Sequence, residues 1–374
     1  MMGTAASWAV SLARVGFVPD DEISGLCGPP WSFLVDELVR TGLSGLFLEA
    51  VARDLLEVPD AVYERVLGGH QNLMSAAVRY EAELAVLLPL LESVGGLVWK
   101  GPILAHGAYP DALWRGFTDL DIIVPRVCLS RFTGALQDAR YLVAWPEPCP
   151  GFLLHVAKAV TMRGPSGLLL DVHGTLAPGV SGDTVFVQEI ISNAIKVRVG
   201  AVEVSAPCWE HHLVACAMHA VLGHGMGRPL AFRDMAEISR RHSLCFDIVA
   251  DTVQRWEVGH VFASAVMKCV LDFGADFPAE IFDRSQSESL SRRERDEEAA
   301  WKSDASRSAK LRLAELRHGS LRRRICLAQA LVLPRPSFLR AFYELPEEKC
   351  AVPRLYMRRW QDLRKQAGHR EGLS

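Results

Sequence analysis

The sequence has no CxxC pair, no HExxH motif and no uninterrupted apolar run long enough to cross a membrane. Its nine cysteines lack regular spacing, which in a chain of 374 residues indicates reduced, mostly buried thiols rather than a disulfide framework or a zinc site. The most apolar window, residues 84–99, is interrupted by Pro89, Glu92 and a Gly-Gly pair, and it is too short to span a bilayer. We therefore expect no membrane partner.

The N-terminus lacks the basic region, apolar run and cleavage site of a secretory signal, so we expect no signal peptide. Together with the cysteine pattern, this predicts a cytoplasmic location. A composition that is 49% hydrophobic argues against a disordered chain and provides for a sizeable core, divided into two or three domains.

The formal net charge is only −3, but it is distributed unevenly. Residues 301–374 contain 17 Lys and Arg against 7 Asp and Glu, which leaves +10 there and −13 in residues 1–300. A basic C-terminal segment therefore follows an acidic body.

Apolar periodicity predicts an α+β protein, in which a small mixed β-sheet with flanking helices lies between an N-terminal helical region and a C-terminal helical domain. The expected segments are an N-terminal helical region (1–95), an α/β core (96–206), a helical domain (207–283), a charged linker or loop (284–310) and a basic helical segment (311–374).

Within the core, helical spacing gives way to short strands at Leu97. Strands are expected at 97–99, 119–124 and 141–145, helices at 102–109 and 128–139, a hairpin from 152–162 and 167–174 around the turn 164–167, and a further β stretch at 197–204.

The stretch DLDIIV places Asp119 and Asp121 in an otherwise apolar strand, where something must offset their desolvation. Side chains alternate along a strand, so both carboxylates project from one face, about 7 Å apart. In LLLDVHG the same alternation puts Asp171 and His173 on one face and supplies a third carboxylate from a neighbouring strand. Three carboxylates predict a site for one or two small hard cations such as Mg²⁺.

Lys100-Gly101 ends a strand and precedes a helix that Pro102 opens. Free N–H groups and the helix dipole favour a phosphate there, and the glycine lets the phosphate approach closely. The turn and the carboxylates together predict phosphoryl-transfer chemistry.

These residues, with Tyr109-Pro110 and Arg115, resemble the polymerase-β-type nucleotidyltransferase superfamily. Within it they are most similar to the bacterial uncharacterised nucleotidyltransferase family, whose pattern runs KG, then R, then DIDhhV, then hDhH. The resemblance covers roughly residues 30–260. The Lys-Gly turn, where the wider superfamily has Gly-Gly or Gly-Ser, also favours the narrower family.

The resemblance implies roles for individual residues. Asp119 and Asp121 would bind Mg²⁺ or Mn²⁺, and Asp171 would complete the metal site and help to activate an acceptor hydroxyl. Lys100, Gly101 and Arg115 would bind an NTP, which is the co-substrate. The implied reaction moves a nucleoside monophosphate from the NTP to an acceptor hydroxyl or phosphate and releases pyrophosphate.

Structural alternatives remain for several of these residues. The DxD pair is also typical of an exposed β-turn. Arg115 could form a structural ion pair with an aspartate, and His173 could be a structural histidine. Asp234, in FRDMAEI, matches a family aspartate on a helix behind the site, or it pairs with a neighbouring arginine.

Two further patterns favour structural roles. The histidines of the helical domain lack a recurring acidic partner, so core or surface positions are expected for His211, His212, His219 and His224. The run GHGMGR, residues 223–228, follows a helix rather than a strand, which predicts an interhelical loop and not a dinucleotide site.

The arginines of the basic segment are interleaved with apolar residues at helical spacing, which favours a helix docked on the acidic body over an RNA-binding surface. The acceptor expected from this is a small molecule or peptide, with a tailoring role on a natural product, peptide or saccharide. The alternatives are a toxin-type nucleotidyltransferase that modifies tRNA and a non-catalytic interaction protein of the same fold. The sequence does not indicate an oligomeric state.

Overall fold

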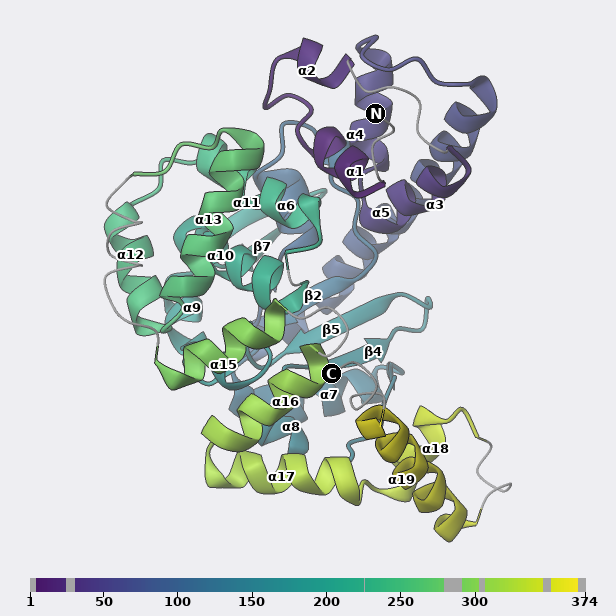
Figure 1. Ribbon diagram of the computed structural model, residues 1–374, viewed down its shortest axis with the longest axis vertical. Helices are drawn as coiled ribbons and strands as arrows, with labels where there is room; N and C mark the ends of the chain where they lie inside the picture. Colours follow the sequence, from purple (N-terminus) through teal and green to yellow (C-terminus); the bar gives the residue numbers. More distant parts are fainter. Residues whose placement is uncertain are drawn as a thin grey trace.

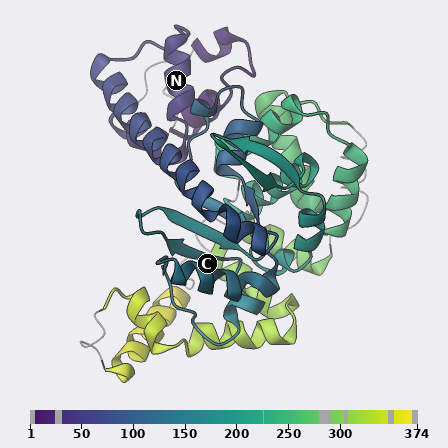
Figure 2. The same ribbon diagram turned by 180° about the vertical axis from the view of Figure 1, so that it is seen from behind.

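The computed structural model describes residues 5–24, 31–224, 226–278, 291–302, 307–345 and 351–368. Helices make up the N-terminal region, at one end of the molecule (Figure 1). They are α1 (Ala5–Ala13), α2 (Asp20–Ser24), α3 (Trp31–Thr41), α4 (Ser44–Ala52) and α5 (Asp60–Ser93). Figure 2 shows the long helix α5 running from this end of the molecule across to the sheet.

The central sheet has five strands in the order β1-β2-β5-β4-β3. The strands are β1 (Leu97–Trp99), β2 (Leu120–Ile123), β3 (Leu142–Val143), β4 (Ala159–Arg163) and β5 (Leu169–His173). Strands β2 and β5 are parallel and the other pairs are antiparallel, so the sheet is mixed. A separate hairpin pairs β6 (Ile195–Val199) with β7 (Val202–Ala206). The predicted α+β class is confirmed.

The two faces of the sheet pack against different helices. Ile122, Leu170 and Val172 belong to a core shared with Leu84 and Leu87 of α5 and with α7 (Leu129–Asp138). Side chains on the other face of β1 and β2, such as Trp99 and Ile123, belong to the core that includes the helical domain. The side chains of Asp121 and Asp171 therefore project toward the helical domain.

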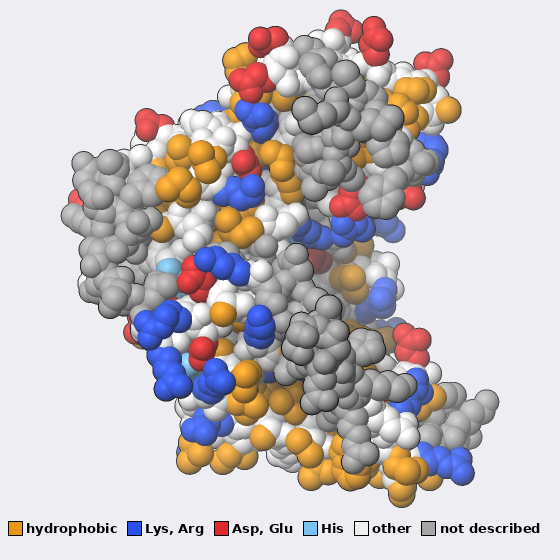
Figure 3. All heavy atoms as spheres, in the orientation of Figure 1, with side chains coloured by type: hydrophobic (Ala, Val, Ile, Leu, Met, Phe, Trp, Pro, Cys, Tyr) orange, Lys and Arg blue, Asp and Glu red, His pale blue; other side chains and the backbone are white. Residues whose placement is uncertain are grey.

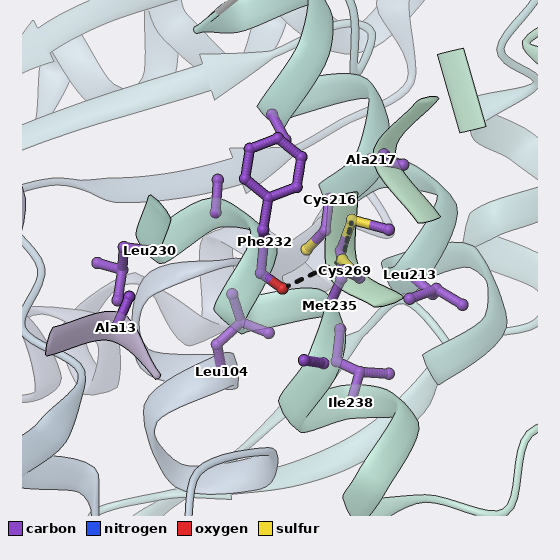
Figure 4. Packing of buried hydrophobic residues seen from close by; sticks show 14 of the residues in the cluster. Ala13, Leu104, Leu213, Cys216, Ala217, Leu230, Phe232, Met235, Ile238 and Cys269 are labelled. Atoms are coloured by element: carbon purple, nitrogen blue, oxygen red, sulfur yellow. Dashed lines mark hydrogen bonds between the residues drawn. The ribbon is translucent and has the colours of Figure 1, made fainter. Parts of the chain in front are cut away.

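The helical domain contains α10 (Trp209–Met218), a π-helical turn (His219–Gly223), α11 (Pro229–Arg241), α12 (Phe246–Arg255) and α13 (Gly259–Phe273). Figure 4 shows Cys216, Phe232, Met235 and Cys269 packed together, close to Leu104 of α6 (Gly101–Gly107). All seven cysteines in the described segments are free thiols. No helix in those segments is long and apolar enough to cross a membrane.

Two local expectations are wrong. Residues 152–155, expected in the first hairpin strand, form the short helix α8 (Phe152–His155), and the strand begins only at Ala159. Part of the expected linker is the helix α15 (Arg292–Trp301), which begins at a capping box between Ser291 and Glu294. Residues 284–290 and 303–306 of that linker lie outside the described residues.

Helix α15 is held by a buried carboxylate. Glu297, which is 2% exposed, accepts hydrogen bonds from the Ser181 backbone N–H and hydroxyl at 3.2 and 2.8 Å. The C-terminal helices are α16 (Arg307–His318), α17 (Leu321–Val332), α18 (Pro336–Phe342) and α19 (Val352–Gly368), and α9 (Val187–Ser192) precedes the small hairpin. The boundaries of the five expected segments stay predictions.

Candidate active site

Parallel pairing of β2 with β5 brings two of the predicted carboxylates together. Asp121 is in register with Asp171, and His173 lies two residues further along β5 on the same face. One ligand atom from each of the three side chains lies within 4.8 Å of the other two. Within the described ranges no other group of three or more His, Cys, Asp and Glu side chains meets this distance.

Asp121 is buried and has two partners. His173 Nε2 lies 2.6 Å from Oδ1, and Lys100 Nζ lies 3.4 Å from both carboxylate oxygens. Burial alone would raise the pKa of Asp121, but the Lys100 ammonium and the hydrogen bond from His173 outweigh it and lower this pKa below its usual value. Burial lowers the pKa of His173, so its ring is neutral and donates Nε2–H to the carboxylate.

Asp119 directly precedes β2 and is not part of the three-residue cluster. It lines the same cavity, where burial and then the charge of Asp121 raise the pKa of Asp119 to about 6. Asp171 accepts a hydrogen bond from the Thr161 hydroxyl at 2.6 Å. Thr161 is the cross-strand neighbour of Asp171 on β4, so this bond fixes one carboxylate oxygen.

Two features constrain the Lys100-Gly101 turn: a hydrogen bond from the Lys100 backbone and the small space beside Gly101. Lys100 has a φ of 52°, which is rare for a residue with a side chain, and its backbone N–H donates to Nε2 of His212 at 3.2 Å. Burial lowers the pKa of His212 to about 3, so this ring is a neutral acceptor. A Cβ on Gly101 would lie 3.3 Å from the ring of Phe117, which leaves little space for any other residue.

Arg115 forms an ion pair with the aspartate of the α11 motif. Its Nε and Nη2 donate to the two carboxylate oxygens of Asp234 at 2.8 and 3.0 Å, and Tyr109 donates its hydroxyl to the same carboxylate at 2.8 Å. Arg115 Nη1 donates to the carbonyl of Gly116 at 2.6 Å. Three of the five N–H groups of the guanidinium are thus engaged, and Asp234 forms an ion pair, with Arg115 as its partner.

The predicted residues surround a cavity of about 300 Å³. Every site residue predicted from the sequence lines it, namely Lys100, Gly101, Arg115, Asp119, Asp121 and Asp171. Figure 3 shows a hollow in the surface between the N-terminal helices and the sheet, with Lys and Arg side chains along its upper edge.

Two residues of the cavity wall carried no signal in the sequence. Lys158 lies directly before β4, and Arg228 lies at the start of α11. His219 and His224 are also part of the wall, and their Nε2 atoms lie 3.0 Å apart. The run GHGMGR does form an interhelical loop as predicted, although Gly225 lies outside the described residues. The loop brings Arg228 to the site, which its glycine spacing did not indicate.

The donor set of the cluster fits a hard divalent cation. Asp121 and Asp171 offer carboxylate oxygens, the ligands that Mg²⁺ and Mn²⁺ prefer. His173 holds one oxygen of Asp121, as expected of a group that orients a metal ligand. The Nδ1 atom of His173 is buried and has no hydrogen-bond partner in the described part of the chain.

Comparison with known proteins gives one result. A search of curated proteins and a search of solved structures each found no match. A family model described as an uncharacterised nucleotidyltransferase matches residues 28–274, which is more than half of the chain and includes the sheet, the carboxylate cluster and the helical domain. The chain therefore belongs to the uncharacterised nucleotidyltransferase family.

Proposed function

We propose that this protein is a metal-dependent nucleotidyltransferase that moves a nucleoside monophosphate from an NTP to an acceptor hydroxyl or phosphate and releases pyrophosphate. The observation that carries the proposal is the cluster of Asp121, Asp171 and His173 on the wall of a cavity of about 300 Å³. Membership of the family supports the same reaction class.

In this proposal Asp121 and Asp171 hold Mg²⁺ or Mn²⁺, and Asp119 adds a third carboxylate at the edge of the site. The bound ion would neutralise phosphate charge and orient the attacking and leaving oxygens. His173 keeps Asp121 in place through the hydrogen bond of 2.6 Å. Asp171 accepts the proton of the acceptor hydroxyl, because it is the cluster carboxylate for which the described residues provide no cationic partner within ion-pair distance.

The Lys100-Gly101 turn would hold the triphosphate. The ammonium of Lys100 lies against Asp121, the carboxylate assigned to the ion. An ion on Asp121 would take over the neutralisation of that carboxylate and leave the ammonium available for a phosphate oxygen. Arg115 acts differently, since it shapes the cavity wall and its charge is already paired with Asp234.

A small molecule or peptide is the acceptor class that we favour over tRNA. Among the three consecutive arginines of α17, Arg323 is 2% exposed and engaged with the body of the protein, which leaves only Arg322 and Arg324 exposed. Two exposed arginines on one helix provide little of the continuous basic surface that RNA binding needs. A tailoring role on a natural product, peptide or saccharide is tested by following labelled nucleotide onto candidate acceptors.

Binding of an NTP with metal is expected to raise the melting temperature. A ligand that binds only the native state stabilises it by about 2.7 kcal/mol at 100 times its Kd. Mg²⁺ or Mn²⁺ alone should give a smaller shift, because the NTP adds its own contacts with the cavity. Differential scanning fluorimetry with each of the four NTPs, with and without metal, measures both effects.

Titration calorimetry on the same samples separates this proposal from its main rival. If no NTP gives heat or a thermal shift in the presence of metal, the cavity does not bind nucleotide. The protein would then be a non-catalytic interaction protein that keeps the nucleotidyltransferase fold.

A further inference from the structure

The lysine and arginine side chains on the cavity wall fall into two groups, those with a carboxylate partner and those without one. Three cations have a carboxylate partner within 4.0 Å: Lys100 with Asp121, Arg115 with Asp234 and Arg40 with Glu37. Lys158 and Arg228 also line the cavity, but the side chain of neither makes a hydrogen bond or ion pair with any described residue.

Lys158 is held in place by its backbone. Its carbonyl accepts a hydrogen bond from the Gly174 N–H at 3.0 Å, and the next residue, Ala159, pairs with His173. Lys158 therefore lies at the end of the sheet where β5 delivers His173 to the metal cluster. Its side chain is half-buried in the cavity that Asp121 and Asp171 also line.

The surroundings of this lysine within the protein disfavour its charge. Burial and then the nearby ammonium of Lys100 lower the pKa of Lys158 to about 8, although Asp121 and Asp171 favour its charged form. An ammonium that burial disfavours and that has no ion-pair partner does not stabilise the fold. Such groups occur where a ligand supplies the missing opposite charge.

Arg228 reaches the cavity from the helical domain, where it directly precedes α11. The charges that act on it most strongly are those of Arg40 and Arg115, followed by Asp119, whereas Lys158 is influenced by Lys100, Asp121 and Asp171. Lys158 is thus the unpaired cation that the sheet places next to β5 and the metal cluster, and Arg228 is the unpaired cation that the helical domain contributes.

We propose that Lys158 is a catalytic residue that contacts the phosphoryl group transferred from the NTP, an inference that rests on the proposed nucleotidyltransferase function. The acceptor oxygen forms a bond to the α-phosphorus, and the bond from that phosphorus to the pyrophosphate oxygen breaks. The bonding electron pair leaves with pyrophosphate, and the acceptor proton passes to Asp171. Lys158 keeps its own proton and neutralises negative charge on the non-bridging oxygens of the α-phosphoryl group.

This assignment separates Lys158 from Lys100. The ammonium of Lys100 is already matched by Asp121 and lies 4.1 Å from the centre of the Trp99 ring. The side chain of Lys158 has neither a carboxylate nor an aromatic ring as a partner among the described residues. The phosphate of a bound NTP would therefore form the ion pair that Lys158 lacks. Its contribution is therefore larger in the transition state, where negative charge on the transferred group must be stabilised.

The test compares Lys158→Met, Lys158→Arg and Arg228→Met, with the exposed Lys196→Met on β6 as the control for loss of one lysine. Turnover and KM for the NTP are measured at saturating metal, and melting temperatures are measured without metal or nucleotide. For Lys158→Met we expect kcat to fall by about 100-fold or more with a small change in KM, as for other lost transition-state contacts. Lys158→Arg should restore part of kcat, and Arg228→Met should mainly raise KM.

The metal-free melting temperature supplies a readout that is independent of activity. Because the charge of Lys158 is unfavourable in the fold, Lys158→Met should melt at the same temperature as wild type or higher. A clear fall in melting temperature would assign Lys158 a structural role and overturn the proposal. Retention of kcat within about threefold in Lys158→Met would overturn it as well.

Failure of the proposed function gives a different pattern. If wild-type protein neither binds nor transfers an NTP with any metal, the nucleotidyltransferase proposal and the role of Lys158 both fall. If wild type and Lys158→Met both transfer nucleotide while Asp121→Asn does not, only the role of Lys158 falls.

Discussion

Asp121→Asn is expected to abolish nucleotide transfer and also to destabilise the protein. The amide removes a charged ligand from the proposed metal site, so turnover should fall below detection. Among the described residues it also removes the only carboxylate within 4.0 Å of Lys100, which is 7% exposed. A buried cation left without its partner costs on the order of 3 kcal/mol. Thermal and urea unfolding of the metal-free protein measure this loss.

The pH dependence of that loss has a definite sign. The pKa of Asp121 is lowered in the folded state, so its charge stabilises the protein above the pKa of an unfolded aspartate. This stabilisation is lost as the pH falls through the pKa that Asp121 has in the folded protein. The difference between wild type and Asp121→Asn should therefore be largest near neutral pH and shrink in acid.

Asp119→Asn is the matched control and should have the opposite effect on stability. Burial and the charge of Asp121 raise the pKa of Asp119 from 3.8 to about 6, so its charged form destabilises the metal-free fold at neutral pH. Asp119→Asn should raise the melting temperature at pH 7, with a gain that shrinks as pH falls from about 6 toward 3.8. Equal destabilisation by both variants would show that the Lys100 ion pair does not cause the difference.

The carboxylate cluster was predictable because strand alternation is a local rule. Alternation placed Asp171 and His173 on one face of their strand, and the turn at 164–167 marked the start of that strand. Parallel pairing with β2 then put Asp171 beside Asp121. Placing Asp171 and His173 beside Asp121 therefore needed only one long-range contact, whereas Asp119 lies outside the cluster.

Lys158 was not predictable because its position depends on where a strand begins. Residues 152–162 look like one continuous strand, but helix α8 occupies the first part and β4 starts one residue after Lys158. The Arg115 ion pair was not predictable for a similar reason, because its partner Asp234 is 119 residues away in the sequence. Contacts at such separation have no local pattern.

Helix α15 shows a different limitation. Its composition is highly charged and suggested a solvated loop, yet Ser291 and Glu294 form a capping box, which is a local helix signal. Burial of Glu297 against Ser181 stabilises the helix, and no charge count could indicate that contact. Composition alone therefore misassigned a segment whose local capping signal was correct.

Arg323→Ala is expected to cause a large loss of stability without affecting any RNA binding. Arg323 donates to Glu315 at 3.2 Å, to Asp183 at 2.7 Å and to the carbonyls of His155 and Val156 at 3.2 and 3.3 Å. Removing this guanidinium leaves Glu315 buried without its cation, which typically costs about 3–5 kcal/mol. Unfolding in urea, followed by circular dichroism, measures the change.

Arg322→Ala and Arg324→Ala are the matched controls, because they flank Arg323 on the same helix and are exposed. Each should change the free energy of unfolding by less than about 0.5 kcal/mol. The same two variants test the RNA alternative, since exposed arginines are the ones that could contact phosphates. If they abolish a tight complex with bulk tRNA that weakens steeply as salt is raised, tRNA becomes the favoured acceptor. If only Arg323→Ala has an effect, and that effect is on unfolding, the basic segment serves to dock α17 on the acidic body.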